Sequence, residues 1–148
     1  MTGVRAGLML MMAIAACSPA GTTKAPPGRP SAFVAHAEPP IGDALNRRLV
    51  RAMTGALDRL EPEWGKLQGR LYTVAPDAGA LAPLVARDLP PGWTRLDLGD
   101  VELRDAELVA WHSGDALYAV LRIDPKGGAI VPAMVLRNDA TLALSSPQ

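Results

Sequence analysis

The chain has few of the side chains on which most catalytic and metal-binding sites depend. Among its 148 residues are one cysteine, two histidines and six aromatic residues. A single cysteine excludes an intramolecular disulfide and any metal site built on several thiolates. The sequence also lacks the G-x-S-x-G elbow of serine hydrolases, the phosphate-binding P-loop and the glycine-rich dinucleotide fingerprint.

Excess charge of either sign is absent as well. Lysine plus arginine and aspartate plus glutamate number 15 each, so the formal net charge is zero. No stretch of the chain gathers basic residues into a polybasic patch, which is the electrostatic signature of nucleic-acid binding. The partner is therefore not expected to be a nucleic acid.

The one long apolar run of the sequence ends at its one cysteine, Cys17. From Ala6 to Ala16 no side chain is charged or strongly polar, and Arg5 is the only charge before Lys24. A span of the bilayer takes about 20 apolar residues, so this run is too short to cross it. Its length and its basic flank are typical of the h-region of a secretory signal peptide.

The residues at the end of this run, Ile14-Ala15-Ala16-Cys17, resemble the lipobox of bacterial lipoproteins. That motif places one aliphatic and two small residues before an invariant cysteine. The resemblance implies a diacylglyceryl group on the Cys17 thiol, cleavage between Ala16 and Cys17, and frequent acylation of the new amine. Two or three acyl chains, such as palmitate, give stable anchoring at about 0.8 kcal/mol for each buried methylene.

Two other interpretations of this stretch stay open. The protein could be an ordinary secreted one in which Cys17 lies by chance, or residues 1–16 could form an uncleaved anchor. Under the lipobox interpretation, Ser18 favours the outer membrane, because an acidic residue at that position often retains lipoproteins in the inner membrane. Removal of residues 1–16 takes Arg5 with it, and leaves 132 residues with a formal charge of −1.

Composition divides the mature chain into three parts. Residues 17–40 are interpreted as the lipidated cysteine and a linker rich in proline, alanine and glycine, in which Phe33 and His36 are incidental. Residues 41–138 carry the periodic apolar pattern of a globular domain. Residues 139–148 are expected to form a flexible C-terminal tail.

Two helices and one strand are predicted in the first half of the domain. Apolar residues from Ile41 to Leu60 recur at helical spacing, with Asp43 as a cap and Pro62 blocking continuation. Residues 67–75 are β-branched and aromatic enough for a strand. A shorter helix is expected over about 79–89, capped by Asp77, although Pro83 disfavours it unless it lies in the first turn.

The second half of the domain is predicted to be a meander of three strands, 106–112, 116–123 and 129–137. Their connections are too short for a parallel crossover, so the strands must be antiparallel. A further short strand has two possible places within 94–104, around Leu96–Leu98 or around Val101–Leu103. The expected fold is a small single α+β domain of order α-β-α-β-β-β, with amphipathic helices packed on one face of a mostly antiparallel sheet.

The few candidates for chemistry do not combine into a site. His112 and Ser113 are adjacent in a predicted strand, so their side chains should diverge. The three tryptophans lie near predicted turns and are interpreted as core residues whose indole N–H groups find partners at the rim. No catalytic residue, metal ligand or cofactor is assigned.

Five acidic residues could in principle hold Ca²⁺, but they lack the spacing of an EF-hand. Arg95 and Arg104 lie among them, which favours a solvated face with partly paired charges. The five are Asp97, Asp100, Glu102, Asp105 and Glu107.

The segment 129–136 suggests a surface for a partner. It is apolar on both faces of the predicted strand, and Pro132 cannot donate a ladder hydrogen bond, which indicates an edge strand. An apolar edge needs a cover. Either other parts of the domain cover it, or Ile130 and Met134 belong to a docking surface for a partner or a second copy of the chain.

Together these features predict a lipid-anchored protein of the cell envelope, on the periplasmic side of the outer membrane. It would act without catalysis by binding another macromolecule, a protein partner, in an accessory, inhibitor or immunity-type role. The alternative functions are a small envelope enzyme and a domain that binds a small ligand or a metal.

Overall fold

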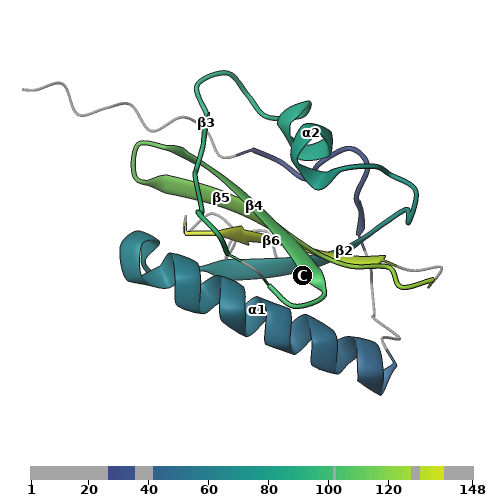
Figure 1. Ribbon diagram of the computed structural model, residues 1–148. Helices are drawn as coiled ribbons and strands as arrows, with labels where there is room; N and C mark the ends of the chain where they lie inside the picture. Colours follow the sequence, from purple (N-terminus) through teal and green to yellow (C-terminus); the bar gives the residue numbers. More distant parts are fainter. Residues whose placement is uncertain (1–26, 36–41, 102, 128–130, 139–148) are drawn as a thin grey trace, which may run out of the picture.

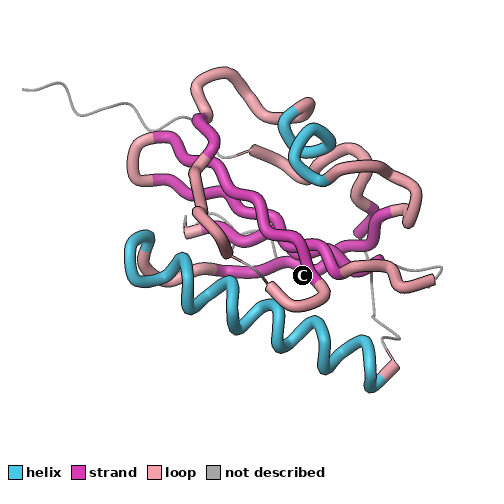
Figure 2. Tube along the Cα trace, in the orientation of Figure 1, coloured by secondary structure: helices cyan, strands magenta, loops and turns pink. Residues whose placement is uncertain are grey.

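The computed structural model describes residues 27–35, 42–101, 103–127 and 131–138. Within these ranges, one antiparallel sheet of order β1-β2-β6-β5-β4-β3 lies between two helices (Figures 1 and 2). The strands are β1 (Val34–Ala35), β2 (Gln68–Val74), β3 (Thr94–Arg95), β4 (Ala106–Ser113), β5 (Ala116–Ile123) and β6 (Val131–Arg137). The helices are α1 (Asp43–Trp64) and α2 (Leu81–Ala86). The predicted α+β domain and its β4-β5-β6 meander are confirmed.

Helix α1 buries the predicted apolar stripe. Leu49, Ala52, Ala56 and Leu60 are buried against the sheet, while Arg51 and other residues of the opposite face are exposed. These side chains pack with one face of the central strands into the α1-side cluster, whose other buried members are Ala110, Leu117, Ala119, Leu121, Ile123, Met134 and Leu136.

Both ends of α1 differ from the predicted ends. The N-cap is Gly42, whose carbonyl accepts from the amides of Leu45 and Asn46, so Asp43 is the first helical residue and not the cap. At the other end the helix continues through Pro62 to Trp64, where Gly65 ends it with a φ of 75°. A proline in the last turn removes a single hydrogen bond. The Trp64 ring contacts the His112 ring with centroids 5.5 Å apart and the ring planes tilted by 45°.

Helix α2 is shorter than predicted and lies on the other face of the sheet. It spans Leu81–Ala86 with Ala80 as N-cap, so Asp77 does not cap it, and Pro83 falls in its first turn where proline is tolerated. The expectation that both helices cover one face is wrong. Leu81 and Val85 pack into the α2-side cluster, whose other buried members are Phe33, Tyr72, Val74, Val109, Trp111, Tyr118, Val120, Val131, Ala133 and Val135.

Strand β6 is central in the sheet, not at its edge. It pairs with β2 along its whole length and with β5 from Ala133 to Arg137. Pro132 stands next to the start of the strand, before the ladder to β5 begins, so its missing N–H removes little pairing. The apolar residues on both faces of β6 are therefore core residues, because α1 covers one face and α2 the other (Figure 1).

Part of the predicted linker belongs to the folded domain. Residues 27–35, here named the N-terminal strap, cross the α2 side of the sheet, and the last two of them form β1. Phe33 is 1% exposed and lies in the α2-side cluster beside Tyr72. The low apolar content of the segment concealed this one buried aromatic side chain. His36 lies outside the described residues.

The two faces of α1 should respond differently to substitution. Leu49 is 6% exposed, so Leu49→Ala should lower the free energy of unfolding by about 2–5 kcal/mol. Arg51 is exposed, so Arg51→Ala should change that free energy by no more than about 0.5 kcal/mol. Urea titration of the two variants gives both numbers. Equal effects from the two positions would contradict the burial of this stripe.

Candidate functional site

The strap is held to the domain by hydrogen bonds at its start. The Tyr118 hydroxyl donates to the Gly28 carbonyl at 3.1 Å, and the Arg137 guanidinium donates to the Pro27 carbonyl at 3.3 Å. Burial raises the pKa of the Tyr118 phenol, so this group stays protonated and remains a donor. Both side chains come from the end of the sheet near the β4–β5 turn, which fixes where the strap leaves the domain.

A second set of hydrogen bonds holds the middle of the strap next to α2. The backbone N–H and the hydroxyl of Ser31 both donate to one carboxylate oxygen of Asp88, at 2.7 and 2.8 Å. Arg87 donates to the Ser31 hydroxyl at 3.0 Å. The Ser31 backbone N–H is the main reason that the pKa of Asp88 lies below its ordinary value. The strap is thus an integral layer of the domain.

The outer edge of β4 is the second feature of interest, because β3 covers only one end of it. The two residues of β3 pair with Trp111 and His112, and beyond them a single hydrogen bond runs from the Leu96 amide to the Ala110 carbonyl, at 2.8 Å. Ser113 and Ala116 flank a two-residue turn, so odd-numbered residues of β4 direct their backbone groups to β5. Even-numbered residues direct theirs outward.

This alternation leaves the backbone of Leu108 facing outward without a neighbouring strand. The Ala106 amide donates to the Leu103 carbonyl at 3.3 Å, and the Ala110 carbonyl accepts from Leu96. Between these two residues, no described strand pairs with the outer side of β4. We call the stretch 106–109 the open edge of β4.

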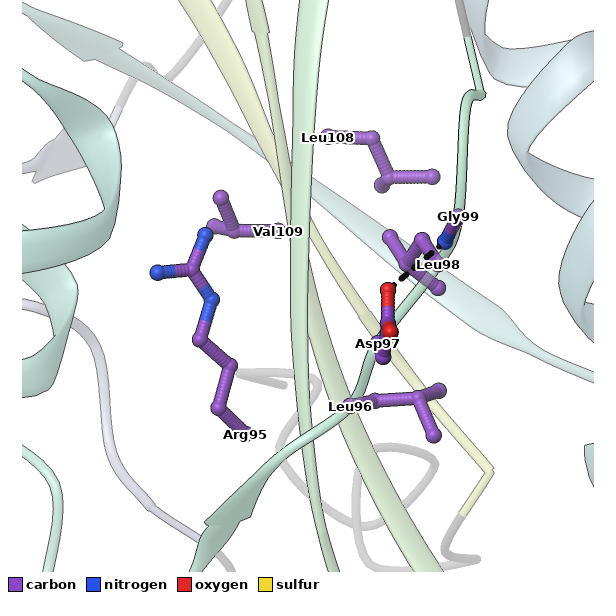
Figure 3. Close-up of a pocket in the computed structure, with 7 residues that line it drawn as sticks. All are labelled: Arg95, Leu96, Asp97, Leu98, Gly99, Leu108 and Val109. Atoms are coloured by element: carbon purple, nitrogen blue, oxygen red, sulfur yellow. Dashed lines mark hydrogen bonds between the residues drawn. The ribbon is translucent and has the colours of Figure 1, made fainter.

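A depression of about 380 Å³ lies beside the open edge (Figure 3). Its lining residues are Arg95, Leu96, Asp97, Leu98, Gly99, Leu108 and Val109. A second depression of about 500 Å³ continues along the strand, shares Leu108 with the first, and is also lined by Val101, Leu103, Arg104, Ala106 and Glu107. We refer to the two depressions together as the groove along β4.

The two sides of this groove differ in chemistry. Leu96, Leu98 and Leu108 lie on the α1 side, where they pack against the α1-side cluster. Arg95 lies on the other side of the strand, near Val109, which belongs to the α2-side cluster (Figure 3). One side of the groove therefore carries the leucines together with the exposed Asp97, and the other side carries an exposed guanidinium group.

The chain after β3 contacts α1 as well as β4. Arg59 donates to the Leu98 carbonyl at 3.3 Å, and the Asp97 carboxylate accepts from the Gly99 amide at 2.9 Å. Leu103 packs so closely on α1 that a Cβ at Gly55 would lie 2.8 Å from its Cδ2. These contacts fix one wall of the groove without occupying the hydrogen-bonding groups of Leu108.

The acidic residues around β4 have partners other than those expected. Asp105 pairs with Lys126 and, at 3.9 Å, with Arg48, and the hydrogen bond from Lys126 is the main reason that its pKa is lowered. Glu107 accepts from Arg122 at 2.8 Å. No ion pair joins Arg95 or Arg104 to a carboxylate in the described ranges. Glu102 lies outside them.

The structure does not bring together the residues considered for catalysis. His112 stacks on Trp64 at the end of α1, while Ser113 is the next residue along the strand, so its side chain points to the opposite face of the sheet. Among the residues that the structure describes, no three His, Cys, Asp or Glu side chains are grouped so that they could hold a metal ion.

The tryptophans fit the expectation only in part. Trp111 is buried in the α2-side cluster. The indole N–H groups of Trp64 and Trp93 are buried, and neither has a hydrogen-bond partner among the described residues, in contrast to the partners expected at the rim. They are two unsatisfied donors of the domain.

The residues predicted to form a docking surface, Ile130 and Met134, are not found on a surface of the described domain. Met134 is 9% exposed and belongs to the α1-side cluster in the central strand, so it is not part of a surface. Ile130 and the predicted lipidation site Cys17 lie outside the described residues. The open edge of β4 was not predicted, because its exposure depends on β3 ending at Arg95.

Comparisons of the chain with protein-family models, with curated proteins and with solved structures found no match. In the described part of the chain, neither helix has the length and apolar character needed to cross a bilayer.

Proposed function

We propose that this chain is a lipid-anchored protein of the bacterial cell envelope whose folded domain acts by binding another macromolecule. The observation that carries the proposal is the sequence Ile14-Ala15-Ala16-Cys17 at the end of a short apolar run with a basic start. Lipid on Cys17 would hold the protein at a membrane, and Ser18 favours the outer membrane. The role is then that of an accessory, inhibitor or immunity-type protein.

The surface of the domain supports binding more than catalysis. Several of its described titratable groups are engaged in structural contacts, such as Asp88 with the strap and Glu107 with Arg122. The groove along β4 instead offers apolar side chains and the guanidinium groups of Arg95 and Arg104. Groups of these kinds recognise a partner chain.

The strap limits how far the domain can move from the anchor. With Pro27 held by Arg137, only residues 18–26 separate the lipidated Cys17 from the folded domain. The chain from Cys17 to Pro27 spans at most about 35 Å when fully extended. A linker reaching to residue 40 would allow about 70 Å. We infer that the domain works close to the membrane surface.

Replacement of the lipid acceptor tests this proposal. In a Gram-negative host, the wild-type protein should sediment with membranes and dissolve only in detergent. Cys17→Ser should accumulate as the longer precursor and lose its lipid, because serine offers no thiol for the thioether bond. Ser18→Asp is the matched control, which should stay lipidated and shift toward the inner membrane. The proposal would be contradicted if the Cys17→Ser protein had the mature length, carried lipid and sedimented with membranes.

A further inference from the structure

We infer that three arginines on the α2 side of the sheet hold the domain against the anionic headgroups of the membrane to which Cys17 tethers it. They are Arg29 of the strap, Arg70 of β2 and Arg95 of β3, here named the arginine patch. The inference rests on the proposed function and deepens it, because it assigns an orientation to a domain that a lipid keeps at the membrane.

The register of the sheet places two of these arginines on the same face. Arg95 lies opposite Trp111, which belongs to the α2-side cluster. Arg70 stands two residues before Tyr72, another member of that cluster, and residues two apart in a strand share a face. Both side chains therefore leave the sheet on its α2 side, as Figure 3 shows for Arg95.

The third arginine lies on the strap that crosses this face. Arg29 follows Gly28, whose carbonyl accepts from the Tyr118 hydroxyl of the central strand β5. All three arginines of the patch are exposed. None of them has a carboxylate within ion-pair distance among the described residues, so their charges are available to an anionic partner.

The carboxylates around the patch do not neutralise it. On the α2 side, Asp88 accepts from Ser31 and lies 3.6 Å from Arg87. Glu107 on the same side is paired with Arg122. Other exposed carboxylates lie elsewhere: Asp97 on the leucine side of the groove, Glu63 and Asp115 at the end of α1, and Asp77 beyond the far end of β2.

The spacing of the patch favours a planar partner. In the strand order, β2 and β3 are four strand spacings apart, which separates the backbones of Arg70 and Arg95 by about 19 Å. A single phosphate group cannot contact both arginines across that distance. A surface that carries many anionic headgroups can contact both of them at once.

The tether selects a lipid surface among planar partners. Pro27, where the described chain begins, is held by Arg137, and Arg137 lies in the same row across the sheet as Arg95. The chain toward Cys17 therefore leaves the domain on the face that carries the patch. Each basic residue at an anionic lipid surface strengthens binding about fivefold.

The opposite face of the domain lacks this bias. On the exposed face of α1, Arg47 and Arg51 alternate with the carboxylate of Asp58. With the patch on the membrane, α1 and the leucine side of the groove along β4 point away from the lipid (Figure 1). That side of the groove stays accessible to the partner of the proposed function.

Paramagnetic lipid tests the orientation on the lipidated mature protein in nanodiscs. The discs hold phosphatidylcholine alone or with about one third phosphatidylglycerol, and a trace of lipid with an uncharged gadolinium chelate. In anionic discs, the amide signals of Arg70 and Arg95 should broaden at least about fivefold more than those of the α1 arginines. In neutral discs, or at about 1 M salt where the Debye length is about 3 Å, the two faces should broaden equally.

Two double variants separate the patch from net charge. Arg70→Glu with Arg95→Glu should remove the difference between the faces in anionic discs. Arg47→Glu with Arg51→Glu changes the net charge by the same amount on the exposed face of α1, and should preserve the difference. In both variants, slow hydrogen exchange of β5 amides verifies that the domain is folded.

Three results would overturn the inference. They are equal or stronger broadening on α1 in anionic discs, a difference that persists in neutral discs, and a difference that survives the double substitution in the patch. Failure of the proposed function is distinguishable from these. If Cys17 carries lipid and the faces broaden equally, the proposed function stands and only the orientation is wrong. If Cys17 carries no lipid, both fail.

Discussion

Phe33→Ala should lower the free energy of unfolding by about 3–5 kcal/mol, although Phe33 lies in a segment whose composition is that of a linker. The side chain is 1% exposed and packs beside Tyr72 with ring centroids 6.1 Å apart. Its removal leaves a cavity in the α2-side cluster between the strap and the sheet. Urea titration at unchanged m-value measures the loss.

The neighbouring residue is the matched control. Val34 is 63% exposed on the same strap, so Val34→Ala should change the free energy of unfolding by no more than about 0.5 kcal/mol. A chain that begins at Gly42 lacks the whole strap and should be at least as unstable as Phe33→Ala. If this shortened chain melted like the full mature protein, the strap would not be part of the domain.

Met134→Glu should prevent stable folding. Met134 is 9% exposed in the central strand β6, beneath α1 and close to Gly69. A carboxylate at this place must be either ionised without a partner or protonated at a cost, and we expect a loss of about 4 kcal/mol or more. Far-ultraviolet circular dichroism and thermal melting would show the effect.

The conservative variant at the same position keeps this prediction testable. Met134→Leu preserves volume and apolar character, so it should cost less than about 1.5 kcal/mol. A Met134→Glu protein that stayed folded and equally stable would show that this side chain faces a surface. That result would support the prediction that β6 belongs to a docking surface.

The elements that local pattern controls were predictable from the sequence. Helical spacing of apolar residues from Ile41 to Leu60 located α1, and two short turns located β4, β5 and β6 as a meander. Each signal lies within a few residues of the structure that it predicts. Of the residues that the pattern placed inside, Leu49, Ala52, Ala56 and Leu60 are buried and Leu45 and Met53 are partly buried, while Ile41 lies outside the described residues.

The order of the strands was not predictable in the same way. Strand β6 pairs with β2, which lies about 60 residues earlier in the chain, and only this pairing makes β6 central. The sequence does carry one signal that bears on the layers of the fold. Strand β5 carries apolar side chains at both odd and even positions, from Leu117 to Leu121, which indicates that both of its faces are covered. Helices on opposite faces follow from that pattern.

The candidate sites also differ in whether a local sequence pattern could reveal them. Cys17 is recognisable from sequence because its motif is local and contiguous. The open edge of β4 is not, since it depends on where β3 stops and on how Leu103 packs against α1. Phe33 is an intermediate case, because a single buried aromatic side chain in a proline-rich segment gives no periodic signal.

Mass spectrometry of the mature N-terminus tests the central claim most directly. The protein is taken from the membrane fraction of cells that express the full chain, and its N-terminal peptide is identified after proteolysis. We predict a chain that begins at Cys17, with a diacylglyceryl group on the thiol and, where the host acylates the new amine, a further acyl chain. An unmodified N-terminus at any other residue would contradict the claim that a lipid anchors this protein.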